Sequence, residues 1–160
     1  ALKKVKKVSG RMEVVVEDPF KVIVDYAHTP DALRGVYKST GKNLICVLGS
    51  CGGGRDAWKR PVLGEIADKN CSKIILTNED PYDEDPKQII EDIKEGINNT
   101  EVEVILDREQ AIKRALKQAS SSNTVVITGK GSEPWMCVAD GEKVPWDDRE
   151  VVKKFVNRNS

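Results

Sequence analysis

Short apolar segments recur along the chain and predict the strands of a β-sheet. Most are rich in β-branched residues, and several are apolar at nearly every position. Continuous apolar runs of this length are typical of strands that are covered on both faces. We expect strands at residues 12–16, 22–24, 44–48, 73–77, 102–106 and 124–128.

Amphipathic segments between these strands predict helices. In each segment apolar residues recur at three- and four-residue spacing, so that they share one face. Two segments begin with a proline, Pro30 and Pro86, which suits the first turn of a helix, and Asp107 is placed to cap another. We expect helices at residues 30–39, 61–69, 86–97 and 108–119.

The alternation of strand and helix predicts an α/β fold. Right-handed crossovers between such strands give a Rossmann-like, mostly parallel sheet flanked by helices. Near the end of the chain, two short β segments surround Asp140 and Gly141 and predict a C-terminal β-hairpin. A final helix should follow from Asp147. With 160 residues, the chain is expected to form one domain spanning residues 1–160.

Composition argues against several classes of partner. The 26 basic residues balance the 26 acidic ones, so no overall charge draws the chain to nucleic acid or to an anionic membrane. The basic residues 1–11 lack aromatic side chains that would stack on bases. No apolar run approaches the roughly 20 residues that cross a bilayer, and no signal peptide is evident. We therefore expect a cytoplasmic protein with no nucleic-acid and no membrane partner.

The cysteines predict neither a metal site nor a disulfide. Their spacing is wide and irregular, without the paired Cys-x-x-Cys motifs that hold zinc. We expect no bound metal, and reduced thiols as is usual in the cytosol. The four residues are Cys46, Cys51, Cys71 and Cys137.

Chemically active residues gather where the predicted strands end, and ligands of open parallel sheets bind beyond these carboxyl ends. Asp25 and the only histidine, His28, follow the strand at 22–24. An aspartate there accepts hydrogen bonds from ligand hydroxyls, and an imidazole contacts a phosphate or a base. The same pair equally suits a capping aspartate with a histidine packed against its loop.

A glycine-rich segment, residues 49–54, follows the strand at 44–48 without matching a known phosphate loop. Cys51 stands where a Rossmann G-x-G-x-x-G needs its second glycine, and Arg55-Asp56 replaces the Lys and Ser or Thr of a P-loop. Glycines still let the backbone approach a ligand, and Arg55 is able to clamp a carboxylate or a phosphate. The alternative is a solvated basic start of the next helix.

Two further loops follow predicted strands. The acidic loop at 77–86 is stiffened by two prolines, and its carboxylates suit either a cationic group or the cap of the next helix. The loop at 128–133 contains Gly129 and Glu133, which either line a pocket or only form a tight turn. By itself the second signal is weak.

Taken together, these segments resemble the C-terminal domain of the Mur ligases. The similarity covers nearly the whole chain from about residue 10, and it is closest to the branch that adds the third residue of the peptidoglycan stem peptide. The pair of motifs DYAHTPDAL and GGxRDxxKRP is the most specific part. The motifs occur in the family's order: GRMEVV, VDYAHTPDAL, GSCGGGRDAWKRP, TNEDPYDEDP, TGKGSE and DDREVV.

The resemblance implies one part of a three-domain ligase. In that family an N-terminal domain holds a UDP-N-acetylmuramoyl peptide, a central P-loop domain binds ATP and Mg²⁺, and the C-terminal domain brings the incoming amino acid. ATP phosphorylates the substrate carboxylate, and the amine attacks the acyl phosphate to form an amide. This sequence contains no P-loop, so we expect the other two domains to be absent from it and this chain alone to be inactive.

The resemblance also assigns roles to individual residues. Arg11, Asp25 and His28 lie near the nucleotide, and Arg55 holds the carboxylate of the amino acid with support from Lys59. Gly129 and Glu133 match positions at the amino acid's far end. No catalytic residue and no metal ligand is expected in this domain alone. The full set of amino-acid-binding positions is Arg55, Glu79, Asp80, Pro81, Tyr82, Gly129 and Glu133.

One departure from the family pattern concerns the amino acid. Diaminopimelate-adding members carry Asp-Asn-Pro-Arg where this chain has Glu79-Asp80-Pro81-Tyr82, and their arginine clamps the second carboxylate. Tyr82 lacks that charge, whereas Glu79 and Asp80 suit a cationic side chain such as that of lysine or ornithine. Ser132 also replaces a histidine of the family.

Two other interpretations stay open at this point. Folylpolyglutamate and cyanophycin synthetases have C-terminal domains of the same architecture. A stand-alone, non-catalytic binding module is the third possibility, since the P-loop is missing.

Overall fold

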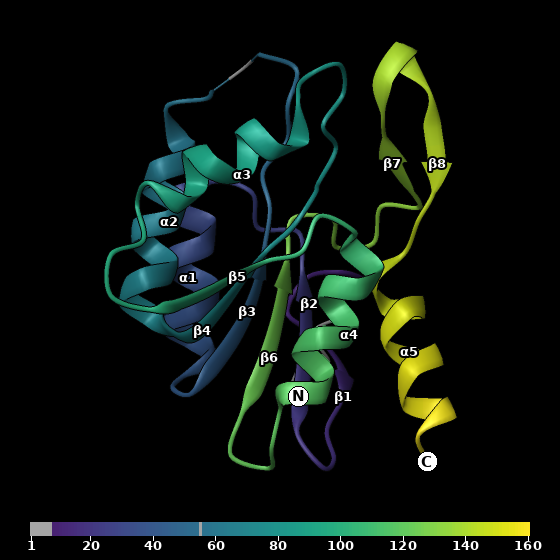
Figure 1. Cartoon of the computed structure of the whole chain (residues 1–160). Coiled ribbons are helices and arrows are strands. Elements are labelled where there is room, and N and C mark those ends of the chain that lie inside the picture. The colour runs from purple at the N-terminus through teal and green to yellow at the C-terminus, as the bar shows by residue number, and fades with distance from the viewer. Residues whose placement is uncertain (1–7, 55) are drawn as a thin grey trace, which may run out of the picture.

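The protein is built around one twisted sheet, which the computed structural model describes over residues 8–54 and 56–160 (Figure 1). The order of strands is β1-β2-β6-β3-β4-β5, and only the edge strand β1 runs antiparallel to its neighbour. This arrangement confirms the predicted mostly parallel sheet. The strands are β1 (Glu13–Val16), β2 (Lys21–Asp25), β3 (Leu44–Leu48), β4 (Cys71–Leu76), β5 (Glu101–Val104) and β6 (Thr124–Thr128).

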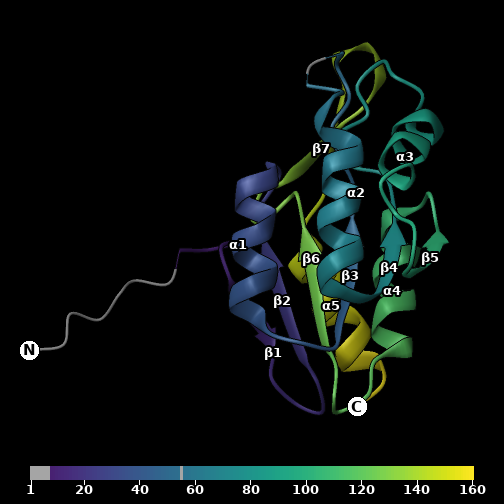
Figure 2. The ribbon, with the colours of Figure 1, turned by 90° about the vertical axis from the view of Figure 1, so that its left-hand side faces the viewer.

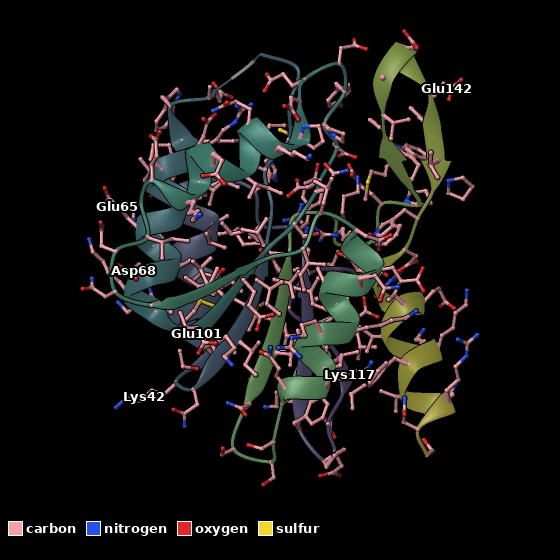
Figure 3. All side chains as sticks on the ribbon, viewed as in Figure 1. Lys42, Glu65, Asp68, Glu101, Lys117 and Glu142 are labelled. Atoms are coloured by element: carbon pink, nitrogen blue, oxygen red, sulfur yellow. A yellow bond between two sulfur atoms is a disulfide. The ribbon has the colours of Figure 1, made fainter. Side chains whose placement is uncertain are left out.

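Helices cover both faces of the sheet (Figures 1 and 2). The helices α1, α2 and α3 bury their apolar residues against one face, whereas α4 and α5 pack against the other. The labelled side chains of Lys42, Glu65 and Lys117 point outward into solvent (Figure 3). The helices are α1 (Pro30–Thr40), α2 (Lys59–Asn70), α3 (Pro86–Lys94), α4 (Arg108–Gln118) and α5 (Asp148–Arg158).

Local sequence explains where these elements begin and end. All five residues of β3 are buried, which is why this strand reads as a continuous apolar run. Side-chain oxygens of Asp85, Asp107 and Asp147 accept hydrogen bonds from backbone amides in the first turns of α3, α4 and α5. The helix α3 ends three residues before the predicted Ile97, because the chain turns at Gly96 to pack closely against α2.

The predicted C-terminal hairpin is present as β7 (Trp135–Cys137) and β8 (Lys143–Pro145), joined by the short 3₁₀ helix η1 (Ala139–Gly141). Asp140 and Gly141 both adopt positive φ angles, 59° and 71°, as the turn requires. No helix of the described residues is long and apolar enough to cross a membrane.

The prediction for the cysteines is wrong for two of them. Cys46 and Cys71 form a disulfide between the neighbouring strands β3 and β4, with their Cα atoms 6.1 Å apart (Figure 3). The two residues lie 25 positions apart in the chain, and only the pairing of their strands brings them together. Cys51 and Cys137 are free thiols, as predicted.

The close contact between α2 and α3 should depend on Gly64. A Cβ atom at this position would lie 2.0 Å from the carbonyl oxygen of Ile93, so Gly64→Ala should destabilise the fold by about 3 kcal/mol through overpacking. Gly35 of α1 is the matched control, because no atom lies within 4 Å of the place that a Cβ atom would take there, and alanine favours a helix by about 0.5 to 1 kcal/mol. Urea denaturation of both variants provides the test, and equal stabilities would contradict it.

Candidate functional site

Three loops meet around a cavity at the carboxyl-terminal edge of the sheet. The cavity has a volume of about 540 Å³. His28 reaches it from the loop after β2, Cys51 to Gly53 from the loop after β3, and Tyr82 from the loop after β4. Lys59, at the start of α2, completes the wall. Three of the four loops that follow predicted strands therefore border this cavity, whereas the loop at 128–133 is not part of its lining.

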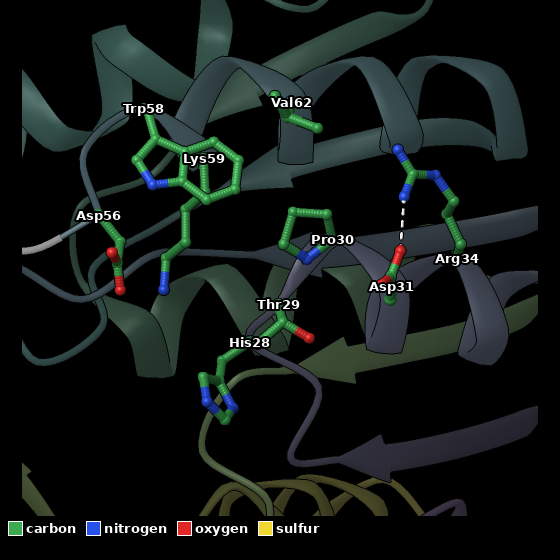
Figure 4. Close-up of a pocket in the computed structure, with 9 residues that line it drawn as sticks. All are labelled: His28, Thr29, Pro30, Asp31, Arg34, Asp56, Trp58, Lys59 and Val62. Carbon is green, nitrogen blue, oxygen red and sulfur yellow. Dashed lines mark hydrogen bonds and ion pairs between the residues drawn. The ribbon is translucent and has the colours of Figure 1, made fainter.

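A second hollow of about 490 Å³ lies between the starts of α1 and α2 and shares His28 and Lys59 with the first (Figure 4). Trp58 lies on its other side with 67% of its surface exposed. Asp31 and Arg34, joined by an ion pair of 2.9 Å, form its outer rim. The two hollows are therefore neighbours that share part of their walls, and an exposed aromatic ring lies beside them.

The carboxylate of Asp25 is hydrogen-bonded to backbone amides. One carboxylate oxygen accepts a hydrogen bond from the amide of Met12 and the other from the amide of Ala27, each at 2.7 Å, and the residue is buried. These contacts match the alternative that Asp25 shapes its own loop. His28 is exposed, and its Nδ1 lies 3.0 Å from the carbonyl oxygen of Tyr26. Because a carbonyl only accepts, Nδ1 carries the proton and Nε2 is left to accept from a ligand.

Arg11 and His28 both lie against the ring of Tyr26. The guanidinium carbon of Arg11 is 5.7 Å from the centre of the Tyr26 ring, and the His28 ring meets that ring edge-on at 4.7 Å. Both Arg11 and His28 are exposed. Two of the three residues expected near the nucleotide are thus grouped around Tyr26 on the surface of the protein.

A buried lysine, which sequence reasoning did not single out, joins two of the loops. Nζ of Lys130 is fully buried and donates to both oxygens of Asp80, at 2.8 and 2.7 Å, and to Glu133 at 2.6 Å. Asp80 also accepts from the amide of Cys137 at 2.8 Å. The expectation that Asp80 is available for a cationic ligand is therefore wrong, because Lys130 already occupies it. The sequence signal that could have identified Lys130 is its position between two glycines in TGKGSE.

Glu133 connects a third loop to this cluster. Its second oxygen accepts a hydrogen bond of 3.2 Å from the hydroxyl of Tyr26, after β2. The Glu133 side chain keeps 34% of its surface exposed. It is therefore partly available to a ligand while it braces Lys130.

Glu79 is the second acid of the loop, and it is only 4% exposed. Burial raises the pKa of its carboxyl group to about 7. The carboxylate packs against Gly129, where φ is +110° and a Cβ atom would lie 2.1 Å from Oε2. Gly129 therefore serves to leave room for Glu79.

Tyr82 and Pro81 shape the other side of the acidic loop. Tyr82 adopts φ +52°, is 41% exposed and lies beside the backbone of Gly53. A Cβ atom at Gly52 would lie 2.0 Å from the carbonyl oxygen of Pro81, so the glycine loop and the acidic loop touch through their backbones. This contact explains why the segment is glycine-rich without being a phosphate loop.

The basic residues after the glycine loop divide into two kinds. Arg60 is buried and donates to Glu84 at 2.6 Å and Asp92 at 2.8 Å, so it serves the fold. Lys59 faces both hollows. Arg55, the predicted carboxylate clamp, lies outside the described residues, and its role stays a prediction.

A second buried ion pair, between Arg108 and Asp148, lies beside the carboxyl ends of β4 and β6. Nε and Nη2 of Arg108 donate to the two oxygens of Asp148, at 2.9 and 2.8 Å, and both side chains are at most 1% exposed. The same guanidinium donates to the carbonyl oxygens of Thr128 at 2.9 Å and Asn78 at 3.3 Å. These carbonyls directly precede Gly129 and Glu79. Within the described residues, no group of His, Cys, Asp and Glu side chains is placed to hold a metal ion.

The fold is that of an α/β domain with two neighbouring hollows at the carboxyl ends of its parallel strands. Residues 10–131 match the family model of the Mur ligase, glutamate ligase domain. The chain therefore belongs to the Mur ligase family and corresponds to its C-terminal domain, as the motifs predicted.

Similar proteins indicate to which branch of the Mur ligase family this domain is most similar. A UDP-N-acetylmuramoyl-L-alanyl-D-glutamate–2,6-diaminopimelate ligase of Aquifex aeolicus is 46% identical over 154 residues, which cover 93% of this chain and 32% of that enzyme. A ligase of the same name from Clostridioides difficile is 44% identical over 158 residues, or 94% of this chain and 32% of its own. The chain thus spans about a third of the length of these relatives.

Solved structures agree with the fold. One titled as a UDP-N-acetylmuramoyl-L-alanyl-D-glutamate–2,6-diaminopimelate ligase superposes with a TM-score of 0.87 at 37% identity, over 95% of this chain and 32% of that one. A bifunctional folylpolyglutamate synthase/dihydrofolate synthase from Yersinia pestis reaches a TM-score of 0.62 at 17% identity, over 98% of this chain and 32% of that one. The second likeness shows the fold alone.

Breaking the Arg108–Asp148 pair should destabilise the protein strongly. Asp148→Asn keeps the shape but leaves the buried guanidinium without its counter-charge, so we expect a loss of about 3 to 5 kcal/mol in the free energy of unfolding. Asp31→Asn is the matched control, because its ion pair with Arg34 has a similar length of 2.9 Å but a 98% exposed aspartate, and it should change stability little. Guanidinium chloride denaturation measures both. Similar losses in the two variants would disprove the structural role of the pair.

Proposed function

We propose that this chain is the C-terminal domain of an ATP-dependent ligase that adds an amino acid to a UDP-N-acetylmuramoyl-dipeptide, in the manner of a UDP-N-acetylmuramoyl-tripeptide synthetase. The observation that supports it most is the meeting of His28, the glycine loop and Tyr82 around one cavity, in a chain whose relatives are named UDP-N-acetylmuramoyl-L-alanyl-D-glutamate–2,6-diaminopimelate ligase. A cytoplasmic location fits such substrates. The folylpolyglutamate alternative has only a shared fold in its favour.

In this proposal the domain supplies the amino-acid site and closes over a nucleotide held elsewhere. ATP and Mg²⁺ belong mainly to the central domain, so the chain alone is inactive. Arg11 and His28 present exposed polar groups toward the nucleotide, while Asp25 holds their loop in shape. Arg55 takes the carboxylate of the amino acid, and Gly129 and Glu133 lie at its far end. The partners are the two other domains of the same enzyme.

A check of the coding sequence separates this proposal from a stand-alone binding module. A ligase requires a P-loop, G-x-x-x-x-G-K-[ST], in the same open reading frame upstream of this domain. Sequencing of the locus answers the question. A reading frame without such a segment would remove the ligase assignment in favour of the module.

We further propose that the amino acid is lysine or ornithine rather than diaminopimelate. The relatives are named for diaminopimelate, but this chain has Tyr82 where the family motif has the arginine that clamps the second carboxylate. Tyr82 lines the cavity and is 41% exposed, so its position is accessible to a ligand. A tyrosine hydroxyl offers one neutral donor in place of two charged ones.

Tyr82→Arg in the intact enzyme should restore the use of diaminopimelate. A bidentate charged contact is worth about 1.5 to 3 kcal/mol, so kcat/KM for diaminopimelate should rise roughly tenfold to hundredfold while lysine gains nothing. Tyr82→Lys is the control, because it adds the charge without the two-pronged geometry and should gain less. Ligation assays with lysine, ornithine and diaminopimelate measure the ranking. A wild-type enzyme that prefers diaminopimelate would refute the specificity.

A further inference from the structure

A third hollow, of about 420 Å³, lies between α4 and α5, on the face of the sheet away from α1, α2 and α3 (Figure 1). Val151 and Phe155 of α5 form its apolar part, and both pack against the core. The described residues that line this α4–α5 hollow belong to the two helices and the residue after α5, and none belongs to the strand-end loops. The hollow is therefore separate from the candidate site at the carboxyl ends of the strands.

The charge around the α4–α5 hollow is unbalanced. Lys113, Lys117, Lys154 and Arg158 line it, and Glu109 is the one acid among its described lining residues, which gives a net charge of +3 in a chain that is neutral as a whole. Glu109 already pairs with Lys113 at 2.6 Å. Within residues 8–54 and 56–160, no acid forms an ion pair with any of the other three cations.

Helix dipoles account for only part of this charge. Lys117 and Arg158 lie in the last turns of α4 and α5, where a cation complements the helix dipole. Lys113 and Lys154 lie before those turns, so the dipoles do not explain them. Cations that surround one hollow repel one another, and a bound anion relieves that repulsion.

The basic region is also small. Toward the start of α5, a neighbouring hollow shares Glu109, Val151 and Lys154 with it, but its remaining charged lining residues are Asp147 and Glu150. The charge therefore changes sign along the pair of helices, which disfavours a long polyanion such as a nucleic acid or an extended acidic peptide. A volume of about 420 Å³ instead falls in the range of roughly 300 to 1,000 Å³ that is usual for small-molecule sites.

We propose that the α4–α5 hollow binds a small phosphate ester with an aromatic or other apolar body. A phosphate monoester carries about two negative charges and three strong acceptor oxygens, which suits Lys117, Lys154 and Arg158 better than a single carboxylate does. The ring of Phe155 offers an apolar surface to the body of the ligand. This inference is independent of the proposed ligase function.

Titration of the full chain with phenyl phosphate, followed in ¹H–¹⁵N NMR spectra, tests the proposal. We expect the largest shifts of backbone amide signals within residues 113–118 and 151–159. Phenyl phosphate should bind roughly fivefold more tightly than inorganic phosphate, because its ring buries apolar surface against Phe155. Binding of both should weaken as sodium chloride is added, since salt screens exposed charges.

Substitutions on α5 separate a built site from general attraction. Lys154→Gln should raise the dissociation constant of phenyl phosphate roughly threefold to tenfold through the loss of one charged contact. Lys153→Gln is the matched control, because Lys153 is the adjacent residue, is also exposed and does not line the hollow, so its variant should change the constant by less than about twofold. Phe155→Leu should remove most of the advantage of phenyl phosphate while leaving the binding of inorganic phosphate nearly unchanged.

Three results would overturn the inference. One is a set of shifts centred on His28 and Lys59, which would place the phosphate at the strand ends. Another is an equal loss of affinity in Lys153→Gln and Lys154→Gln, which would show attraction to the surface in general. The third is a hexaglutamate peptide that binds the α4–α5 hollow more tightly than phenyl phosphate, which would make the occupant an acidic protein segment.

Discussion

The buried ion pair of Arg108 and Asp148 sets the geometry of the edge where the strands end. One planar guanidinium makes two parallel bonds to the carboxylate and two more to the backbone carbonyls of Thr128 and Asn78. Those carbonyls close β6 and the turn after β4, so the next residues, Gly129 and Glu79, are placed by the same group. A guanidinium is suited to this task because its donors have a fixed planar arrangement.

Two neighbouring acids at this edge, Asp80 and Glu79, have different surroundings. Asp80 is satisfied three times over, by Lys130 and by the amide of Cys137, and thereby ties the acidic loop to the TGKGSE turn and to the hairpin. Glu79 lies one residue away, is 4% exposed and packs its carboxylate against Gly129. The pairing of Asp80 thus fixes the backbone on which Glu79 is carried.

Much of the fold could be predicted from the sequence because its signals are local. Buried parallel strands such as β3 read as unbroken apolar runs, and proline or aspartate marks the start of several of the following helices. The disulfide between Cys46 and Cys71 could not be predicted, because it depends on which strands become neighbours. Lys130 and Arg108 were missed for the same reason, since their acids lie 50 and 40 positions away in the chain.

For the site, the resemblance to the Mur ligases predicted which residues lie there. It did not predict which of their side chains are already bonded within the domain. It placed Glu79 and Asp80 together in an amino-acid pocket, and only the folded structure shows that Lys130 already binds both oxygens of Asp80. It also predicted that Asp25 approaches the nucleotide, whereas the carboxylate is held by two amides of its own loops. Local hydrogen bonding of this kind follows from how loops from different strands meet, which a motif does not encode.

The hollows at the carboxyl ends of the strands are open to solvent. This explains why recognition of a substrate should need the rest of the enzyme. His28, Trp58 and Tyr82 are exposed around the hollows, so water reaches their walls from the side that faces away from the sheet. A charged contact to a ligand in these hollows gains strength when water is excluded, because the attraction grows as the local dielectric falls. Closure of a neighbouring domain over these residues would exclude that water and cover the exposed rings. Within the proposed ligase, recognition of the amino acid should therefore be complete only when a second domain covers this edge.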